Sequence, residues 1–160
     1  MEYDNSAVRR QDRLLEKSEA LRLRREGEYG VLSFCDGNQA YGIPVDYAWD
    51  GNTSIFIHCA PEGRKLRILE KNPRVSFCVV GPTRVISRLF TTEYESVVAQ
   101  GTAFRTKTDE EKRFGLELII DKYSPHDRAI GQKYLEKSFQ RTAMIRMDIE
   151  TLSGKCKKMK

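Results

Sequence analysis

The chain has 160 residues, the length of one ordinary domain and enough to bury a proper core. Charged residues make up 32% of the sequence and apolar residues 39%, but the apolar residues are clustered, which argues against disorder except at the ends. The net charge of +5 suits an anionic small molecule as well as a nucleic acid, so it excludes neither class of partner.

The sequence carries no targeting signal that we can identify. Met1 to Arg13 is polar and charged and lacks the apolar run of a signal peptide. No apolar run approaches the ~20 residues of a membrane span. The four cysteines show no CxxC spacing, so we expect free and mostly buried thiols at Cys35, Cys59, Cys78 and Cys156. These features predict a cytoplasmic protein without a membrane partner.

Residues 1–27 are predicted to form an N-terminal helical segment. Four leucines, Leu14, Leu15, Leu21 and Leu23, are spaced as the narrow apolar stripe of one or two surface helices. Gly27 ends this pattern, as expected for a glycine that follows a helix.

From Tyr29 to Cys59 the pattern changes to three β-rich runs. Two copies of Asp-Gly-Asn, Asp36–Asn38 and Asp50–Asn52, separate these runs. Asp-Gly between apolar runs favours a tight hairpin, because glycine supplies the positive φ that the turn requires. Two hairpins in series predict an antiparallel meander.

The second half alternates helical and strand-like patterns. A helix should open at Arg64 and end at Asn72-Pro73, and strands should follow in "RVSFCVVG" and in "YESVVAQGTAFRT", with Gly101 at a bend or bulge. Thr108 can cap a helix over "TDEEKRFGLELIIDKYS", and a second helix should span His126 to Phe139.

The last strand is predicted in "RTAMIRMDIETL", where Ala143, Ile145, Met147 and Ile149 alternate with polar residues. Residues 153–160 read as a loose basic tail. About six strands, with helices at the start, after the third strand and before the last, predict a single mainly β domain over residues 1–160. A closed or nearly closed antiparallel barrel with peripheral helices fits this order best.

Two adjacent cations open the helix that follows the strand "IFIHC". Arg64 and Lys65 lie in its first turn, where the helix dipole already places partial positive charge. A phosphate at this position would be bound by free backbone N–H groups and by both side chains. The alternative that these are simply solvated surface residues stays open at this point.

The order of the motifs resembles a known family. The β-hairpin, "IFIHCAPEGRKLRILEKNPRVSFCVV", "FTTEYESVVAQGTA" and the final "SGK" resemble the FMN-binding split-barrel flavoproteins related to pyridoxamine 5′-phosphate oxidase. Within that group the chain looks most like the Nim branch, the 5-nitroimidazole resistance proteins. The resemblance implies a six-stranded antiparallel split barrel and a homodimer with FMN at the subunit interface.

The resemblance also implies site residues. Arg64 and Lys65 would grip the FMN phosphate, and His58 and Cys59 would line the flavin site. The strand "YGIPV" would run along the isoalloxazine edge, and Ser96 would lie near the phosphate or the ribityl chain. The predicted cofactor-binding residues are therefore Tyr41, Ile43, Pro44, Val45, His58, Cys59, Arg64, Lys65 and Ser96.

Two departures from the family bear on the substrate. Nim-like sequences often carry His at position 64, where this chain has Arg. The second strand lacks the Arg and Lys that the oxidases use, which argues against pyridoxamine phosphate as substrate. The resemblance therefore implies a flavin oxidoreductase that takes electrons from a reduced nicotinamide or another donor and reduces a small electrophile, such as a nitroimidazole or another nitroaromatic compound.

His58 is the candidate catalytic residue, because an imidazole can donate a hydrogen bond or a proton near neutral pH. The alternative is a histidine that is merely hydrogen-bonded at the barrel rim. A metal site is not expected, since His58 and Cys59 are adjacent on a strand and point to opposite faces.

Three other functions remain as alternatives: a flavin binder without turnover, a barrel that binds haem or a deazaflavin, and a small-barrel nucleic-acid-binding module. Strand aromatics and the basic excess favour the last of these, and the aromatics are Tyr41, Tyr47, Trp49 and Tyr94. No aromatic-basic motif of the RNP type supports it, which makes nucleic acid an unlikely partner.

Overall fold

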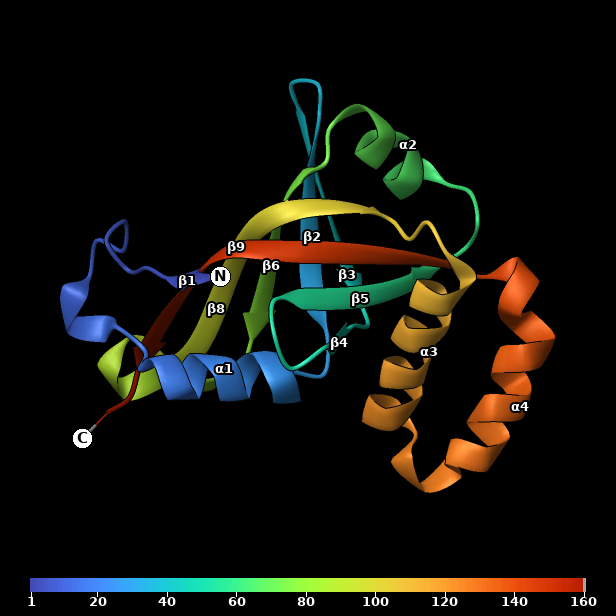
Figure 1. Ribbon diagram of the computed structural model, residues 1–160. Helices are drawn as coiled ribbons and strands as arrows, with labels where there is room; N and C mark the ends of the chain where they lie inside the picture. The colour runs from blue at the N-terminus through green and yellow to red at the C-terminus, as the bar shows by residue number, and fades with distance from the viewer. Residues whose placement is uncertain (160) are drawn as a thin grey trace.

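The computed structural model of the chain describes residues 1–159 and is built around one curved β-sheet with helices on its outside (Figure 1). The strands follow the order β3-β2-β6-β8-β9-β5-β4, with β1 paired to β9 and β7 paired to β8. Every pair is antiparallel except β1–β9. The strands are β1 (Glu2–Tyr3), β2 (Gly30–Asp36), β3 (Gln39–Val45), β4 (Ala48–Trp49), β5 (Ser54–Cys59), β6 (Arg74–Val80), β7 (Arg84–Ile86), β8 (Thr91–Arg105) and β9 (Ala143–Lys157).

Six of these strands have six or more residues, and they are the six that the sequence predicts. The short strands β1, β4 and β7 carry too few residues to show an alternating pattern, so the sequence does not reveal them. The path of the sheet has two ends, β3 and β4, which makes the barrel open rather than closed.

Each of the four α-helices lies within a segment where the sequence predicts a helix, and all four lie outside the sheet. In Figure 1, α1 lies below the sheet, α2 lies above it, and α3 and α4 form an antiparallel pair beside one end. Thr108 caps α3 as predicted, since its hydroxyl accepts a hydrogen bond from the Glu111 N–H. The helices are α1 (Lys17–Glu26), α2 (Arg64–Lys71), α3 (Asp109–Tyr123) and α4 (Arg128–Ser138), and the 3-10 turns are η1 (Gln11–Arg13), η2 (Ser87–Leu89), η3 (Pro125–Asp127) and η4 (Phe139–Arg141).

The two Asp-Gly-Asn turns do form hairpins, but the predicted meander is wrong. Asp36–Asn38 joins β2 to β3, and Asp50–Asn52 joins β4 to β5. The predicted middle strand is divided after Val45 into β3 and β4. Strand β3 therefore lies at the outer edge of the sheet, and β5 pairs with β9 rather than with β3. Pro44 lacks the N–H that a central strand needs, which suits β3 to the edge of the sheet.

Strands β8 and β9 form the longest ladder of the sheet. Its register shifts between Gln100 and Gly101, which confirms the predicted bulge. A Cβ at Gly101 would lie 1.9 Å from the Asp148 carbonyl oxygen, so the crossing of the two strands requires glycine. The alternating residues of the last strand, Ala143, Ile145, Met147 and Ile149, are all buried, as predicted.

The two ends of the chain differ from the prediction. Within residues 1–27 only Lys17–Glu26 is α-helical, and Glu2–Tyr3 forms a strand against Thr151 and Leu152. The predicted loose tail is also wrong for residues 153–157, which continue β9; Lys160 lies outside the described residues. The Gly154 carbonyl accepts a hydrogen bond from the Leu15 N–H, so the N-terminal and C-terminal segments stabilise one another. A local sequence pattern does not indicate such a long-range pairing.

Gly27 ends α1 for a different reason than the one predicted. Its φ of −54° is open to any residue, so a left-handed cap is not what selects glycine. A Cβ at this position would lie 2.3 Å from Val79 Cγ1 and 2.9 Å from the Tyr47 hydroxyl oxygen. The glycine therefore allows α1 to pack closely on the sheet.

All four cysteines are free thiols, but they are less buried than predicted: Cys35 is exposed and the other three are half-buried. None of the described helices combines the length and the apolarity that a membrane span would require.

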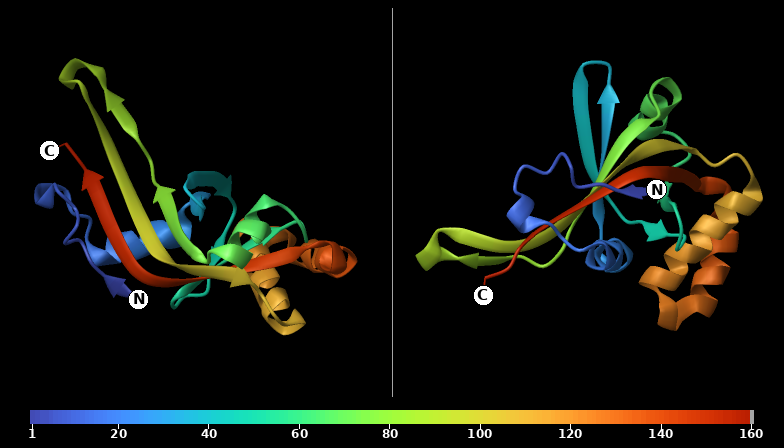
Figure 2. Two further views of the ribbon diagram at one scale, coloured as in Figure 1. Left: turned by 90° about the horizontal axis from the view of Figure 1, so that it is seen from above. Right: turned by 60° about the vertical axis from the view of Figure 1, so that its left-hand side comes forward.

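Figure 2 shows β7, η2 and the first part of β8 projecting from the body of the molecule as an arm (residues 81–95). Two apolar side chains on this arm are largely in solvent: Val85 is 75% exposed and Phe90 is 98% exposed.

Candidate functional site

The first turn of α2 combines two cations with uncapped backbone N–H groups, an arrangement that suits an anion. Gly63 precedes the helix at φ +143°, a conformation that favours glycine, and a Cβ there would meet open space. No side chain caps the helix, and its first turn holds no acidic residue. Arg64 and Lys65 are therefore the charged groups beside its free backbone N–H donors.

Arg64 is held in place by the β2–β3 hairpin. Its guanidinium lies 4.2 Å from the centroid of the Tyr41 ring, and its Nη2 lies 3.2 Å from Asp36 Oδ2. Tyr41 in turn stacks on buried Phe34, with ring centroids 5.6 Å apart. Two of the predicted site residues, Tyr41 and Arg64, thus come together on a rigid support, and the guanidinium keeps further donors for a ligand.

A third cation that the sequence analysis missed lies at this end of the sheet. Arg105, the last residue of β8, donates from Nη1 to the Pro61 carbonyl oxygen (3.4 Å). Burial raises the pKa of the Cys59 thiol, and the positive charges of Lys65 and Arg105 partly oppose that effect. Arg105 is far from Lys65 in sequence, and only the packing of α2 near the end of β8 brings their charges to one thiol.

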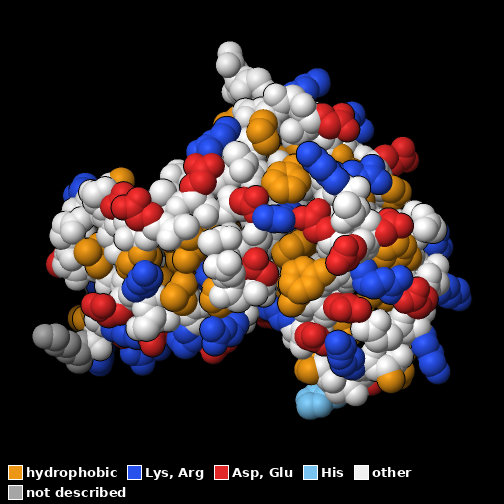
Figure 3. Space-filling view, in the orientation of Figure 1, with side chains coloured by type: hydrophobic (Ala, Val, Ile, Leu, Met, Phe, Trp, Pro, Cys, Tyr) orange, Lys and Arg blue, Asp and Glu red, His pale blue; other side chains and the backbone are white. Residues whose placement is uncertain are grey.

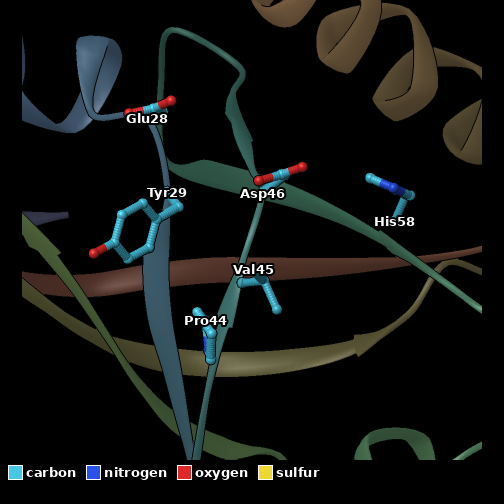
Figure 4. Close-up of a pocket in the computed structure, with 6 residues that line it drawn as sticks. All are labelled: Glu28, Tyr29, Pro44, Val45, Asp46 and His58. Carbon is cyan, nitrogen blue, oxygen red and sulfur yellow. The ribbon is translucent and has the colours of Figure 1, made fainter.

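The other end of β3 borders an open pocket of about 530 Å³ (Figure 4). Its lining residues are Glu28, Tyr29, Pro44, Val45, Asp46 and His58. Figure 4 shows Pro44, Val45 and Asp46 coming from the end of β3, and His58 from β5. The structure therefore gathers three predicted residues here, and it adds Glu28, Tyr29 and Asp46, which carry no motif.

The two clusters lie at opposite ends of the same edge strand. Tyr41 and Val45 are four residues apart, which corresponds to about 13 Å along a strand. Ile43 lies between them, half-buried against the core. The arrangement suits an elongated ligand with an anionic group at α2 and a flat or apolar part near His58.

His58 and Cys59 do point to opposite faces of β5. His58 is exposed, whereas Cys59 is half-buried and packs against the core. Within residues 1–159 no three His, Cys, Asp or Glu side chains gather as a metal-binding group.

Ser96 is the predicted site residue that the fold places elsewhere. It lies in β8 opposite Val80 and Lys155, close to the projecting arm, while α2 packs against β8 nearer to its other end. Within one chain Ser96 does not join Arg64 and Lys65.

Comparison with known proteins agrees with this architecture. Residues 16–156 match a family model described as pyridoxamine 5′-phosphate oxidase. A search among curated proteins found no match.

Three solved structures illustrate the likeness in fold. A candidate 5-nitroimidazole antibiotic resistance protein from Bacteroides thetaiotaomicron is 18% identical, with 90% of this chain and 86% of that chain covered and a TM-score of 0.73. A FAD-binding protein from Mesorhizobium loti is 20% identical over 91% and 98% of the two chains, with a TM-score of 0.66. A FAD- and haem-binding protein from Mycobacterium smegmatis is 18% identical over 90% and 72%, with a TM-score of 0.71.

The fold is thus the antiparallel split barrel with peripheral helices that the sequence resemblance implies. The family model covers most of the chain, including the β2–β3 hairpin, α2 and both long strands. The chain belongs to the pyridoxamine 5′-phosphate oxidase family.

Proposed function

We propose that this protein is an FMN-binding oxidoreductase that reduces a small electrophile such as a nitroaromatic compound. The observation that carries the proposal is the pair Arg64 and Lys65 in the first turn of α2, a turn that has free backbone N–H donors and no acidic residue of its own. The carboxylate that pairs with Arg64, Asp36, lies on the β2–β3 hairpin and is bound through a single guanidinium nitrogen. The FAD-binding descriptions of two similar structures support a flavin in this fold.

The residues present fit FMN at both of its ends. The phosphate would lie at the start of α2, with Arg64 fixed by Tyr41 and with Lys65 beside it. The ring would lie along β3 toward Pro44, Val45 and His58, which line one pocket. Because β3 is an outer strand, its free backbone edge can hydrogen-bond to the ring.

FMN held by Arg64, Lys65 and the edge of β3 would supply the electron transfer between a reduced nicotinamide, or another donor, and the substrate. The protein binds and orients both partners. His58 is exposed in the pocket, where it can hydrogen-bond to the ring or to the substrate and deliver a proton. No second acid is needed for hydride transfer.

We also propose that the protein acts as a homodimer with FMN at the interface. Ser96 would then reach the ribityl chain or the phosphate from the second copy, since it does not reach α2 in its own chain. Four free thiols fit a reducing compartment, in keeping with the proposed cytoplasmic location.

A nucleic-acid-binding function has less support. Tyr47 is fully buried, and the ring of Trp49 is covered by the Arg24 guanidinium at 3.9 Å, so neither ring is free to stack on a base. On the face shown in Figure 3, basic and acidic side chains alternate rather than form one basic stripe.

The test is FMN binding to a double variant. Replacing Arg64 and Lys65 by Ala removes two charge-assisted contacts, and each such contact contributes about 1.5–3 kcal/mol, so the FMN dissociation constant should rise by roughly 100-fold or more. Binding is followed by the shift of the flavin absorbance bands and by fluorescence quenching.

Lys71→Ala is the matched control, because Lys71 is an exposed cation in the last turn of the same helix. It should bind FMN like the unsubstituted protein. Stoichiometric FMN in the folded double variant would disprove the phosphate assignment, and a protein that leaves the flavin spectrum unchanged would disprove the function.

A further inference from the structure

A second cavity opens between α3 and α4, and the flavin assignment does not use it. Its volume is about 350 Å³, within the range of small-molecule sites. Most of its wall is apolar, and its lining residues are His58, Leu116, Ile119, Ile120, Ser124, Asp127, Ile130, Gly131, Tyr134, Leu135, Ser138 and Thr142. We call this cavity the α3–α4 cleft.

Glycines set the position of the two helices that form the cleft. A Cβ at Gly131 would lie 2.9 Å from Ile120 Cγ2, so glycine lets α4 approach α3 closely at this point. A Cβ at Gly115 would lie 2.6 Å from Phe56 Cδ1, which brings α3 down onto β5. The cleft is therefore fixed by backbone packing on both sides.

Large apolar side chains at the cleft remain in solvent. Ile130 is 68% exposed and Tyr134 is 69% exposed, although both lie on a helix that packs against another. In Figure 3, hydrophobic side chains show between charged ones over the α3 and α4 part of the molecule. Apolar side chains around a concave cleft, rather than on a flat face, favour a ligand that fills it.

Two hydroxyl groups of the cleft are already hydrogen-bonded to the backbone. The Ser138 hydroxyl donates to the Tyr134 carbonyl (2.8 Å), and the Thr142 hydroxyl donates to the Ser138 carbonyl (3.1 Å). The cleft contains no Lys or Arg, and its one acid is Asp127. This lining suits a neutral ligand, because an organic anion would meet a carboxylate and no permanent cation.

His58 belongs to both cavities. It lines the open pocket beside Pro44 and Val45, and it also lines the α3–α4 cleft. Figure 4 shows α3 and α4 on the side of the pocket where His58 lies. A molecule in the cleft would thus meet His58 at the point where the cleft reaches the proposed flavin ring.

We propose that the α3–α4 cleft binds the apolar body of the electron-accepting substrate, a neutral aromatic or heteroaromatic compound whose polar group faces His58. The proposal rests on the flavin function and adds the substrate class and its binding site. Ile119, Ile120 and Leu116 form the apolar wall, and Tyr134 offers a ring for stacking. His58 donates a hydrogen bond to the nitro or carbonyl oxygen of the substrate.

The test uses ligand binding to the FMN-free protein, so that it does not depend on turnover. A neutral nitroimidazole is titrated into isotope-labelled protein, and amide chemical shifts are followed by NMR. The largest shifts are expected at Leu116, Ile120, Gly131 and Thr142. Shifts that map only outside the cleft, or no shifts at millimolar nitroimidazole, overturn the proposal.

Substitutions of residues that line the α3–α4 cleft test whether the nitroimidazole binds there. Ile119→Trp fills the cleft and should weaken nitroimidazole binding by about tenfold or more, the scale of steric discrimination in apolar pockets. Leu118→Trp is the matched control, because Leu118 is half-buried in the same helix but does not line the cleft, and it should bind normally. His58→Ala should weaken binding several-fold. Equal affinities of the Ile119 and Leu118 variants overturn the proposal.

Two further measurements separate this proposal from the flavin function and from a rival occupant. If the FMN spectrum never shifts but the nitroimidazole maps to the cleft, the flavin function fails and the cleft remains a ligand site. If FMN binds and the nitroimidazole maps elsewhere, the cleft assignment alone fails. If Ile130→Asp converts a dimer into a monomer, a second copy covers the cleft and the proposal is overturned.

Discussion

The ammonium group of Lys122 lies against the ring of buried Tyr47. Its Nζ is 3.5 Å from the centroid of the Tyr47 ring and donates to the carbonyl oxygens of Gly27 (2.7 Å) and Tyr47 (2.9 Å). Burial lowers the pKa of Lys122 to about 8, and the negative charge of Asp46 partly opposes this effect. The lysine thus ties α3 to the turn between α1 and β2.

The lowered pKa of Lys122 predicts a rise in stability at alkaline pH. Unfolded lysine titrates near pH 10.4, so between about pH 8 and 10 the unfolded state binds more protons and the free energy of unfolding rises with pH. Below about pH 8 both states are charged and this contribution is constant. Burial raises the pKa values of Tyr47 and Tyr123, so these tyrosines affect stability only above about pH 10. The raised pKa values of Cys59 and Cys78 act against the rise below that pH, but equally in the protein and in a Lys122 variant, so the difference between the two reports Lys122.

Denaturant unfolding of the protein and of Lys122→Met across this pH window checks the prediction. The variant should be less stable overall, because the Gly27 and Tyr47 carbonyl oxygens lose the hydrogen bonds from the ammonium group. It should also lack the Lys122 contribution that grows between about pH 8 and 10. Lys133→Met, which removes an exposed lysine of α4, is the matched control. Parallel curves for the protein and Lys122→Met would contradict the assignment.

At the scale of elements, an ion pair between Arg22 of α1 and Glu95 of β8 joins the helix to the sheet. The carboxylate is buried, whereas the arginine is partly exposed. Arg22 Nη2 donates to both Glu95 carboxylate oxygens, at 2.9 and 3.1 Å, and Glu95 is only 8% exposed. Arg22 also pairs with Glu19 and Glu26 on its own helix. One arginine thus balances the buried carboxylate of β8.

Removing only the arginine should therefore cost more than removing both partners. Arg22→Met leaves the Glu95 carboxylate buried without a partner and should lower the free energy of unfolding by about 2 kcal/mol, less than for a fully buried pair because Arg22 is partly exposed. Adding Glu95→Leu should restore most of that loss. Urea unfolding of the two variants measures the difference, and a double variant no more stable than Arg22→Met would refute this account.

Elements with a clear local pattern were predictable, and the pairing of distant strands was not. The Thr108 cap, the Gly101 bulge and the buried alternation of β9 all follow from a few neighbouring residues. The predicted meander is wrong because a hairpin signal shows only which two strands a turn connects. The order of strands in the sheet depends also on where β3 can pair, and Pro44 disfavours a central position for it.

The same division holds for the site. The cations of α2 were found because their position conflicts with the helix dipole, a local signal. Arg105 and Asp46 were missed, since each reaches the site only through packing between elements far apart in sequence. Glu28 and Tyr29 likewise lie in a connection without any motif.

At the scale of the whole molecule, the projecting arm is the feature that one chain does not explain. Phe90 has a φ of +47°, which is unusual for an aromatic residue, and its side chain is 98% exposed. In an isolated monomer, both the positive φ of Phe90 and the exposure of its ring to water would cost free energy. A second copy that packs against the arm would offset this cost.

Phe90→Asn separates folding from assembly, because Asn adopts positive φ more readily than Phe. The free energy of unfolding of the monomer should stay unchanged or rise slightly. The dissociation constant of the proposed homodimer should rise by about tenfold or more if Phe90 is an aromatic anchor of its interface. Analytical ultracentrifugation over a range of concentrations measures this. Equal dimer affinity for Phe90→Asn and the unsubstituted protein would exclude the arm from the interface.

Strand β9 is the last strand of the sheet to be translated, so the sheet cannot be completed until this strand has been made. It pairs with β1, β5 and β8, and its Asp148 accepts a hydrogen bond from the hydroxyl of Ser54, 94 positions earlier. On a ribosome, residues 143–157 emerge after all of these partners, so β5 and β8 wait with open edges until nearly the whole chain has been translated. Stalled or truncated products that end before residue 143 would expose those edges and would be prone to pair with other chains.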